Sequence, residues 1–192
     1  TRSTVLAHSV FLTDSDMDRV RSRGAGVAHC ALSNAYFGNA VFPLRKALER
    51  GLNVGLGTDI SGGPSASMLE AARMTVAVSR MLQDGVDPDD SRETRGRPES
   101  RIDLLTAFHL ATAGGGIALD LDIGLFRPGY YFDALIIDAA AEAGTIRLFG
   151  AQPADRIEQI LYTAIRPNIA ATYVGGDLVA HNHESAAALP RT

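Results

Sequence analysis

The sequence predicts an α/β protein whose first half is built from parallel strand–helix units. Short apolar runs alternate with amphipathic stretches, and the order strand, loop, helix occurs three times, which is typical of parallel βα units. The expected strands cover residues 5–8, 26–30 and 53–57. Each strand ends in a polar residue or is followed by one. Because the carboxyl ends of parallel strands converge on one opening, this edge is where reactive groups are expected.

Helix signals separate the expected strands. A first helix is expected over 13–22, where Thr13 and the acidic residues after it supply an N-cap and negative charge at the helix start. A second is expected over 42–50, because Pro43 tolerates an early helical position. A long amphipathic helix is expected over 65–82, where apolar residues recur on one face.

The second half of the chain starts with a break in this pattern. Residues 84–100 are dense in charge and have almost no apolar residues, which predicts a surface loop. Helix is expected again over 101–113, with an interruption at the three glycines 114–116 and a short helical stretch to Leu119. The expected organisation is therefore a first domain over 1–125 that includes this loop.

A smaller second domain is expected over 126–181, followed by a tail over 182–192. A strand is predicted over 131–137, and one or two helical turns over 156–161. The paired glycines at 175–176 lie between two apolar runs and predict a β-hairpin.

Composition excludes several classes of protein. The chain has 192 residues, 46% of them hydrophobic and 21% charged, which excludes disorder over its whole length. Its net charge of −4 argues against binding to nucleic acid. No apolar run is long enough for a membrane helix, and no signal peptide is apparent. Cys30 is the single cysteine, so an internal disulfide and a multi-cysteine zinc site are both excluded. A cytoplasmic protein that binds neither membranes nor nucleic acid is the expectation.

Two polar residues at strand ends are the main candidates for chemistry. Asp59 lies among glycines in the segment GLGTDISGG, where the backbone can approach a ligand and the carboxylate has few neighbours. A structural alternative is an N-cap for the helix that follows, but Asp59 lies too early for that role. His8 ends the first strand, where a functional imidazole and a buried structural one are equally plausible.

Other polar residues have structural explanations that are at least as good. His29 fits a core histidine, and Ser33–Asn34 after it fits a side-chain turn. His109 is expected on a helix face, and the His181 and His183 pair lies in the expected tail, which lacks further ligands. The glycines at 114–116 follow a helix and have no lysine, so they are not a phosphate loop.

Three motifs carry a resemblance to a known family. They are LAH at 6–8, GAGVAHCALSN at 24–34, and GLGTD at 55–59 with SASML at 65–69. Together they resemble the metal-dependent amidohydrolase superfamily, and within it the guanine deaminase branch, whose pattern is close to AHCP-x-SN … GLGTD-x-GGG-x-S-x-SML. The likeness extends to about Ala180 and so covers nearly the whole chain.

The resemblance implies a fold and a set of roles. The chain is expected to be the C-terminal part of a TIM-like (β/α)8 barrel, with added strands of a small β-sandwich. Asp59 matches the aspartate that ligates the single zinc ion, contacts the substrate and shuttles a proton. His8 matches a histidine close to the attacking water and the substrate. His29 and Ser33–Asn34 match a loop that forms part of the pocket wall.

The implied reaction is zinc-dependent hydrolytic deamination of guanine, a small purine, to xanthine and ammonia. The chain departs from the family at Ala31, where proline is usual, and at Ile60–Ser61, which leaves the shape of the pocket open. The family's H-x-H pair, a further histidine and a catalytic glutamate do not occur before His8, so most zinc ligands are expected outside this chain. Two alternatives remain: deamination of another aminated heterocycle, or a fragment that is inactive by itself. Members of the branch are often dimeric, which leaves a homodimer open.

Overall fold

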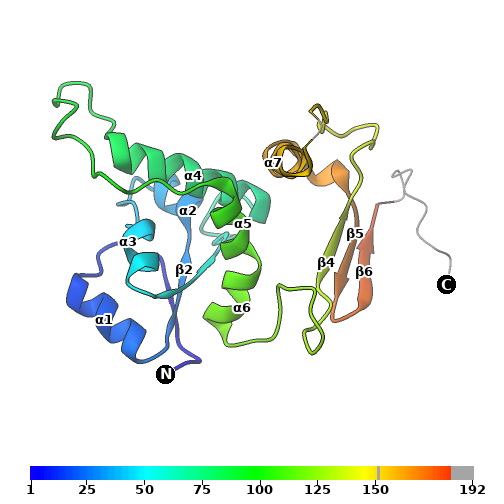
Figure 1. The fold of residues 1–192 in the computed structure, drawn as a ribbon, viewed down its shortest axis with the longest axis horizontal. Coiled ribbons are helices and arrows are strands. Elements are labelled where there is room, and N and C mark those ends of the chain that lie inside the picture. The colour runs from blue at the N-terminus through cyan, green and yellow to red at the C-terminus, as the bar shows by residue number, and fades with distance from the viewer. Residues whose placement is uncertain (151, 183–192) are drawn as a thin grey trace. The chain divides into compact units, whose positions relative to one another are not determined.

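The computed structural model describes residues 1–150 and 152–182 and divides into two compact units. The first unit is Thr1–Asp122 and the second is Ile123–Thr192. Figure 1 shows helices grouped around parallel strands in the first unit and a three-stranded sheet in the second. The α/β class is thus confirmed, and each unit is described by itself below.

The first unit is organised around three parallel strands. These are β1 (Val5–Ala7), β2 (Gly26–His29) and β3 (Asn53–Leu56), arranged in that order with β2 in the middle. The register aligns the carboxyl ends of β2 and β3, where His29 lies opposite Leu56. All three predicted strands are therefore present, each one residue shorter than expected. Within the described residues the three strands form an open sheet and no closed barrel.

Six helices connect and cover these strands. They are α1 (Asp14–Ser22), α2 (Ala31–Tyr36), α3 (Leu44–Glu49), α4 (Met68–Asp84), α5 (Leu104–Ala111) and α6 (Ala113–Leu119). Thr13 caps α1 through a capping box with Asp16, as the sequence indicates. The helix expected to begin at Ser65 instead begins at Met68, because the Ser67 side chain accepts the backbone N–H of Glu70 and so acts as the N-cap.

The expected helix break at the three glycines is wrong. The break falls at Thr112, and glycines 114–116 lie inside α6. Close packing requires glycine at Gly114, where a Cβ would lie 2.7 Å from the carbonyl oxygen of Val54 in β3. It also requires glycine in the strands, because a Cβ on Gly55 of β3 would lie 2.8 Å from the Cα of Gly115, and one on Gly26 of β2 would lie 2.2 Å from the carbonyl oxygen of Ala118. Side chains at these positions would push α6 off the sheet, so the glycines of strand and helix allow a contact between backbones.

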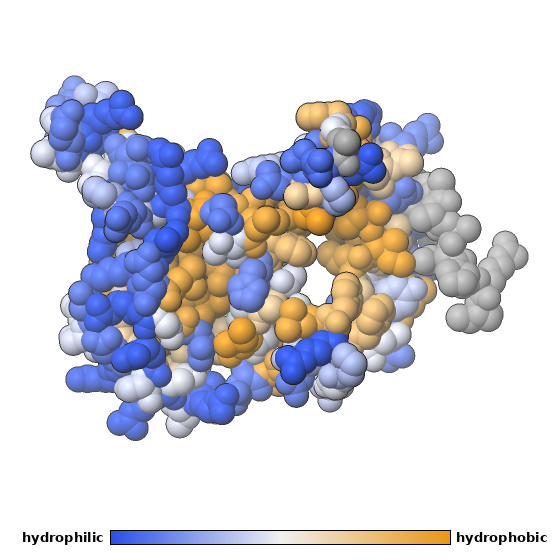
Figure 2. All heavy atoms as spheres, in the orientation of Figure 1, coloured by the Kyte–Doolittle hydropathy of each residue, from blue (hydrophilic) through white to orange (hydrophobic). Residues whose placement is uncertain are grey.

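Apolar side chains from strands and helices fill the core of the first unit. Val27 of β2 and Val54 of β3 are buried against residues of the surrounding helices. The larger helical contributions come from Met17, Leu44, Val76, Leu104 and Leu110. Residues 85–100 form neither helix nor strand and are mostly exposed, as predicted, and Figure 2 shows this segment as hydrophilic.

The second unit contains an antiparallel sheet and one longer helix. The strands are β4 (Ala134–Ile137), β5 (Ile169–Val174) and β6 (Asp177–His181), and the helix is α7 (Pro153–Thr163). A short 3₁₀ helix, η1 (Arg166–Asn168), leads into β5. The hairpin predicted at Gly175–Gly176 is confirmed, with β5 and β6 paired antiparallel and both glycines at positive φ.

Three expectations for this unit need correction. The expected strand 131–137 begins only at Ala134, and the expected helical turns 156–161 form a full helix of 11 residues. His181 belongs to β6 rather than to a tail. The rest of the expected tail lies outside the described residues from position 183 onward, His183 included. No helix in the described part of the chain is long and apolar enough to cross a membrane.

Candidate active site

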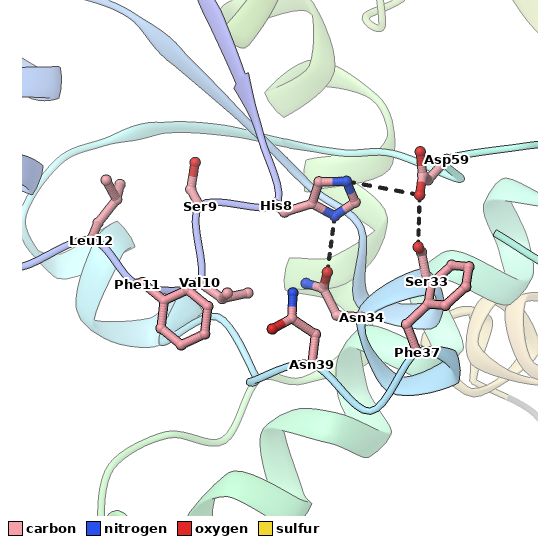
Figure 3. Close-up of a pocket in the computed structure, with 10 residues that line it drawn as sticks. All are labelled: His8, Ser9, Val10, Phe11, Leu12, Ser33, Asn34, Phe37, Asn39 and Asp59. Carbon is pink, nitrogen blue, oxygen red and sulfur yellow. Dashed lines mark hydrogen bonds and ion pairs between the residues drawn. The ribbon is translucent and has the colours of Figure 1, made fainter. Parts of the chain in front are cut away.

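Both candidate residues from the sequence line one cavity at the carboxyl edge of the parallel sheet (Figure 3). His8 directly follows β1, and Asp59 lies three residues after the end of β3. The cavity has a volume of about 580 Å³. Its lining residues are His8, Ser9, Val10, Phe11, Leu12, Ser33, Asn34, Phe37, Asn39 and Asp59. The fold therefore brings together two residues that are 51 positions apart in the chain.

The backbone at both positions adopts a conformation that is unfavourable for most side chains. His8 and Ser9 have φ values of 61° and 57°, and Asp59 and Ser61 have 53° and 84°. This left-handed region costs an L-residue roughly 1–2 kcal/mol. Strain of this kind gathers at functional sites, because the surrounding structure holds the residue in a geometry that local preference alone would not select.

A tight turn and a hydroxyl group fix the Asp59 carboxylate. The backbone N–H groups of Gly62 and Gly63 both donate to the carbonyl oxygen of Asp59. A Cβ on Gly62 would lie 2.9 Å from Oδ2 of Asp59, so a larger residue there would displace the carboxylate. The Ser33 hydroxyl donates to Oδ2 over 2.7 Å. The Asp59 side chain still keeps 33% of its surface exposed and faces the cavity.

His8 lies between an amide and this carboxylate. Its Nδ1 is 2.9 Å from Oδ1 of Asn34, and its Nε2 is 3.8 Å from Oδ2 of Asp59. An amide oxygen only accepts hydrogen bonds, so in this arrangement Nδ1 carries a proton and donates to Asn34. Figure 3 shows the imidazole between the two partners, with its Nε2 edge toward Asp59.

His29 is a core residue and does not line the cavity, so the expected pocket-wall role is wrong for it. It ends β2 but is 1% exposed, and its ring centroid lies 5.5 Å from that of Phe42. Burial, with a smaller electrostatic contribution from the neighbouring His8, lowers the pKa of His29 to about 4, which keeps the His29 imidazole neutral at neutral pH. Burial likewise raises the pKa of the adjacent Cys30 thiol. The structural interpretation of His29 is the correct one.

Ser33 and Asn34 have a different conformation and role from the expected turn. They lie inside α2, a short helix that begins directly after β2, and both line the cavity. Sequence reasoning also missed Phe11 and Phe37, exposed aromatic residues of the cavity lining. Large apolar side chains in polar loop segments were the available signal. His109 is exposed on α5 and is not among the lining residues.

The donors available to a metal ion are few. Within the described residues there is no group of three or more His, Cys, Asp or Glu side chains that could hold one. Zinc sites in enzymes use three protein ligands and leave one position open. Asp59 nevertheless fits one position of such a site, because its carboxylate lines the cavity and only its Oδ2 is engaged by Ser33. Carboxylate oxygens are among the ligands that zinc accepts.

Residues 1–179 match the Amidohydrolase family, so the chain belongs to that family. It is 37% identical over 186 residues to the guanine deaminase of Mus musculus, covering 93% of this chain and 39% of the mouse protein. The crystal structure of the guanine deaminase from C. acetobutylicum with bound guanine in the active site matches with a TM-score of 0.73 and 27% identity, covering 91% of this chain and 38% of that one.

A third comparison reaches beyond guanine deaminases. The crystal structure of an adenosine deaminase from Xanthomonas campestris with bound zinc matches with a TM-score of 0.68 at 21% identity, covering 94% of this chain and 38% of that one. That likeness concerns the fold alone. In all three comparisons the chain spans less than two fifths of its relative's length.

Proposed function

We propose that the polypeptide containing this chain hydrolyses guanine to xanthine and ammonia, and that this chain contributes Asp59 and His8 to the active site. One observation carries the proposal: a half-buried carboxylate and an imidazole meet in a cavity at the carboxyl edge of parallel strands. The 37% identity to the mouse guanine deaminase, over 93% of this chain, supports guanine as the substrate.

The proposed architecture follows from the same comparisons. The strands β1, β2 and β3 would be neighbouring strands of a (β/α)8 barrel, which needs about 250 residues and eight strands. The sheet of β4, β5 and β6 would form part of a small β-sandwich. The proposed domain limits remain 1–125 for the barrel part and 126–181 for the sandwich part, with a tail over 182–192.

Zinc is the proposed cofactor, one ion per active site. Asp59 would hold it, and the remaining ligands would come from outside this chain. Bound zinc lowers the pKa of a coordinated water from 15.7 toward about 7, so that the nucleophile is available at neutral pH. Asp59 suits the ligand role because Ser33 engages its Oδ2, while Oδ1 makes no hydrogen bond to any described residue.

The residues of this chain would perform two tasks in the reaction. Asp59 accepts the proton that the attacking water loses as its oxygen bonds to the ring carbon bearing the amino group. His8 accepts a hydrogen bond at Nε2 and so orients that water, since its Nδ1 proton is directed to Asn34. A proton donor outside this chain would protonate the ring nitrogen next to that carbon. The proton held by Asp59 would then pass to the amino group as the carbon–nitrogen bond breaks, so that it leaves as ammonia. The added hydroxyl would return its proton to the outside group, and the ring carbon keeps the oxygen as the new carbonyl of xanthine.

The test compares two aspartates with similar φ values. Asp59→Asn in the complete polypeptide should lower guanine turnover by about 10²–10⁴-fold, as expected on loss of a positioned acid–base group. Asp120 has a φ of 57°, close to the 53° of Asp59, and lies at the end of α6, where it pairs with Arg2. Asp120→Asn should leave turnover unchanged.

Two further measurements complete the test. Zinc content should fall in the Asp59→Asn protein and stay the same in the control. A panel of purines, pterins and triazines should show guanine as the preferred substrate. Near-normal guanine turnover by Asp59→Asn would contradict the proposal, whereas preference for another heterocycle would keep the site and change the substrate.

A further inference from the structure

Helix α2 supplies one side-chain hydrogen-bond partner to Asp59 and one to His8. Ser33 and Asn34 are adjacent in sequence, and the first contacts Asp59 while the second contacts His8. Ser33 is 1% exposed and Asn34 is 3% exposed, whereas the side chains they contact are 33% and 36% exposed. All four residues line the cavity, but the two helix residues are far more buried than the side chains that they contact.

We propose that Ser33 and Asn34 are positioning residues: Asn34 fixes the Nδ1–H tautomer of His8, and Ser33 fixes the orientation of the Asp59 carboxylate. The inference rests on the proposed function for its catalytic consequence. The tautomer of His8 is a separate physical statement, which can be measured whatever the substrate is.

The direction of the hydrogen bond between His8 and Asn34 supports the proposed role of Asn34. The Asn34 amide oxygen lies 2.9 Å from Nδ1 of His8, so Nδ1 donates to it. In the neutral imidazole Nε2 is then the acceptor, and it lies 3.8 Å from Oδ2 of Asp59. A neutral histidine held in this way accepts a hydrogen bond at Nε2, for example from a water molecule. A hydrogen bond at one ring nitrogen commonly sets the function of the other in this manner.

The alternative orientation of the amide predicts the opposite. If the Asn34 amide were rotated by 180°, its NH₂ group would donate to Nδ1, and Nε2–H would then donate to Asp59. His8 and Asp59 would in that case form an ordinary hydrogen-bonded pair. In the orientation observed, Nδ2 of Asn34 is buried and has no hydrogen-bond partner among the described residues. The carbonyl contact to His8 is thus the amide's one side-chain hydrogen bond in the described chain.

The hydrogen bond from Ser33 supports the second part of the proposal, which concerns the orientation of the Asp59 carboxylate. Its hydroxyl donates to Oδ2 over 2.7 Å and therefore occupies one lone pair of the carboxylate. A Cβ on Gly63 would lie 3.3 Å from the Cβ of Ser33, so the turn that contains Asp59 packs directly against the serine. Rotation of the carboxylate would break the serine hydrogen bond, which leaves Oδ1 as the oxygen free for other partners.

The short connection from β2 makes this arrangement rigid. Helix α2 begins at Ala31, two residues after β2 ends, and the backbone N–H of Asn34 donates to the carbonyl oxygen of Cys30. The backbone N–H of His8 donates to the carbonyl oxygen of Ala28 in β2. The positioning residues and His8 are therefore both anchored on the central strand of the sheet.

The decisive experiment measures the tautomer of His8 in the zinc-loaded, complete polypeptide. Long-range ¹H–¹⁵N correlation spectra of protein labelled with ¹⁵N-histidine distinguish the two tautomers, and the His8 signal is assigned by its absence in His8→Asn. We expect a proton on Nδ1 and none on Nε2. A proton on Nε2, alone or with one on Nδ1, would overturn the assignment to Asn34. An inactive wild-type protein would refute the proposed function, yet the spectrum would still decide the tautomer.

Variants test the catalytic consequence. Asn34→Leu should lower kcat about 10–100-fold, the usual range for residues behind a metal site, with KM changed less than about 3-fold. Asn34→Asp keeps an acceptor at the same place and should restore kcat to within about 3-fold of wild type. Ser33→Ala should lower kcat about 10-fold.

The matched control is Asn53→Leu, because Asn53 begins β3 at the opposite edge of the sheet and donates to the carbonyl oxygen of Gly24. This variant should leave kcat and KM unchanged. Equal loss of kcat in Asn34→Leu and Asn34→Asp would show that the amide NH₂ group is what matters and would overturn the proposal.

Discussion

Both edges of the parallel sheet contain residues at positive φ, but the residue types differ between the edge where β2 and β3 begin and the edge where β1 and β3 end. The turns that lead into β2 and β3 use Gly24 and Gly51 at positive φ, where glycine has no steric cost. The segments that leave β1 and β3 place His8 and Asp59 at similar φ values. One edge is therefore relaxed and the other strained, and the strained edge carries the cavity. The comparison shows where this fold accepts backbone strain to place polar side chains in the cavity.

His29, at the end of β2, provides a second comparison with His8. His29 occupies a strand end as His8 nearly does, but it is buried, neutral and absent from the cavity lining. Position at a strand end is therefore insufficient for a reactive role. Exposure to the cavity distinguishes the two histidines.

The largest expected effect comes from the strained edge. His8→Asn should lower guanine turnover of the complete polypeptide by about 10²–10⁴-fold, because the group that orients the attacking water is lost. Asparagine tolerates a positive φ, so the melting temperature should change little. His109→Asn on the exposed face of α5 is the control and should keep full activity. If His8→Asn kept the wild-type rate of turnover, His8 would have no role in the proposed reaction.

The buried histidine predicts a pH effect on stability. Its pKa is about 4 when folded and 6.5 in the reference state, so between these values the unfolded chain binds more protons. Stability is then highest above pH 6.5, falls as the pH drops toward 4, and loses about 3 kcal/mol from this group at most.

Urea unfolding of wild type and His29→Leu measures this effect. As the pH falls from 7.5 to 4, the free energy of unfolding of the wild type should decrease relative to that of His29→Leu. A difference that does not depend on pH would show that His29 is not held neutral by burial.

A smaller loss of stability is expected where the sheet contacts α6. Gly55→Ala places a methyl group 2.8 Å from the Cα of Gly115, and the overpacking should cost about 1–3 kcal/mol. Gly115→Ala is the matched control, because its Cβ would meet no atom closer than 3.8 Å, and it should be neutral or raise helix stability by up to about 1 kcal/mol. Denaturant unfolding compares the two. Equal effects would contradict the proposed backbone contact.

The smallest effects come from exchanging residues between the two kinds of turn. Gly51→Ala adds roughly 1–2 kcal/mol of strain at a φ of 73° and regains about 0.4–1 kcal/mol by restricting the unfolded chain, for a net loss of about 1 kcal/mol. Ser61→Gly should do the reverse and raise the free energy of unfolding by up to about 1 kcal/mol. Thermal unfolding measures both, and destabilisation by Ser61→Gly would show that Ser61 is not strained.

Local signals in the sequence accounted for elements in both units. The three strands, the capped start of α1 and the hairpin at Gly175–Gly176 follow from apolar runs, an N-cap residue and a glycine pair. Asp59 and His8 were found because each lies at or just after a strand end, and Asp59 also lies among glycines. Such features depend on neighbours within a few residues, which is the range over which sequence patterns are informative.

The features that sequence reasoning missed depend on distant neighbours. Glycines 114–116 indicate a helix break by propensity, but contact with β2 and β3 keeps them helical. Ser33–Asn34 suggests a turn, whereas the structure uses both residues within α2 to hold side chains 26 positions away in either direction. Nothing local distinguishes these outcomes, because the deciding partners are brought near only by folding.

The sequence by itself determined the α/β class, the family motifs and the identity of the two residues that face the cavity, since each is encoded in a short run of residues. The tertiary structure decided which histidine is exposed, that Asn34 and Ser33 contact His8 and Asp59, and where α6 and the strands come close enough to require glycine. These outcomes depend on distances between segments remote in the chain, and such distances are set by the packing of the strands and helices against one another.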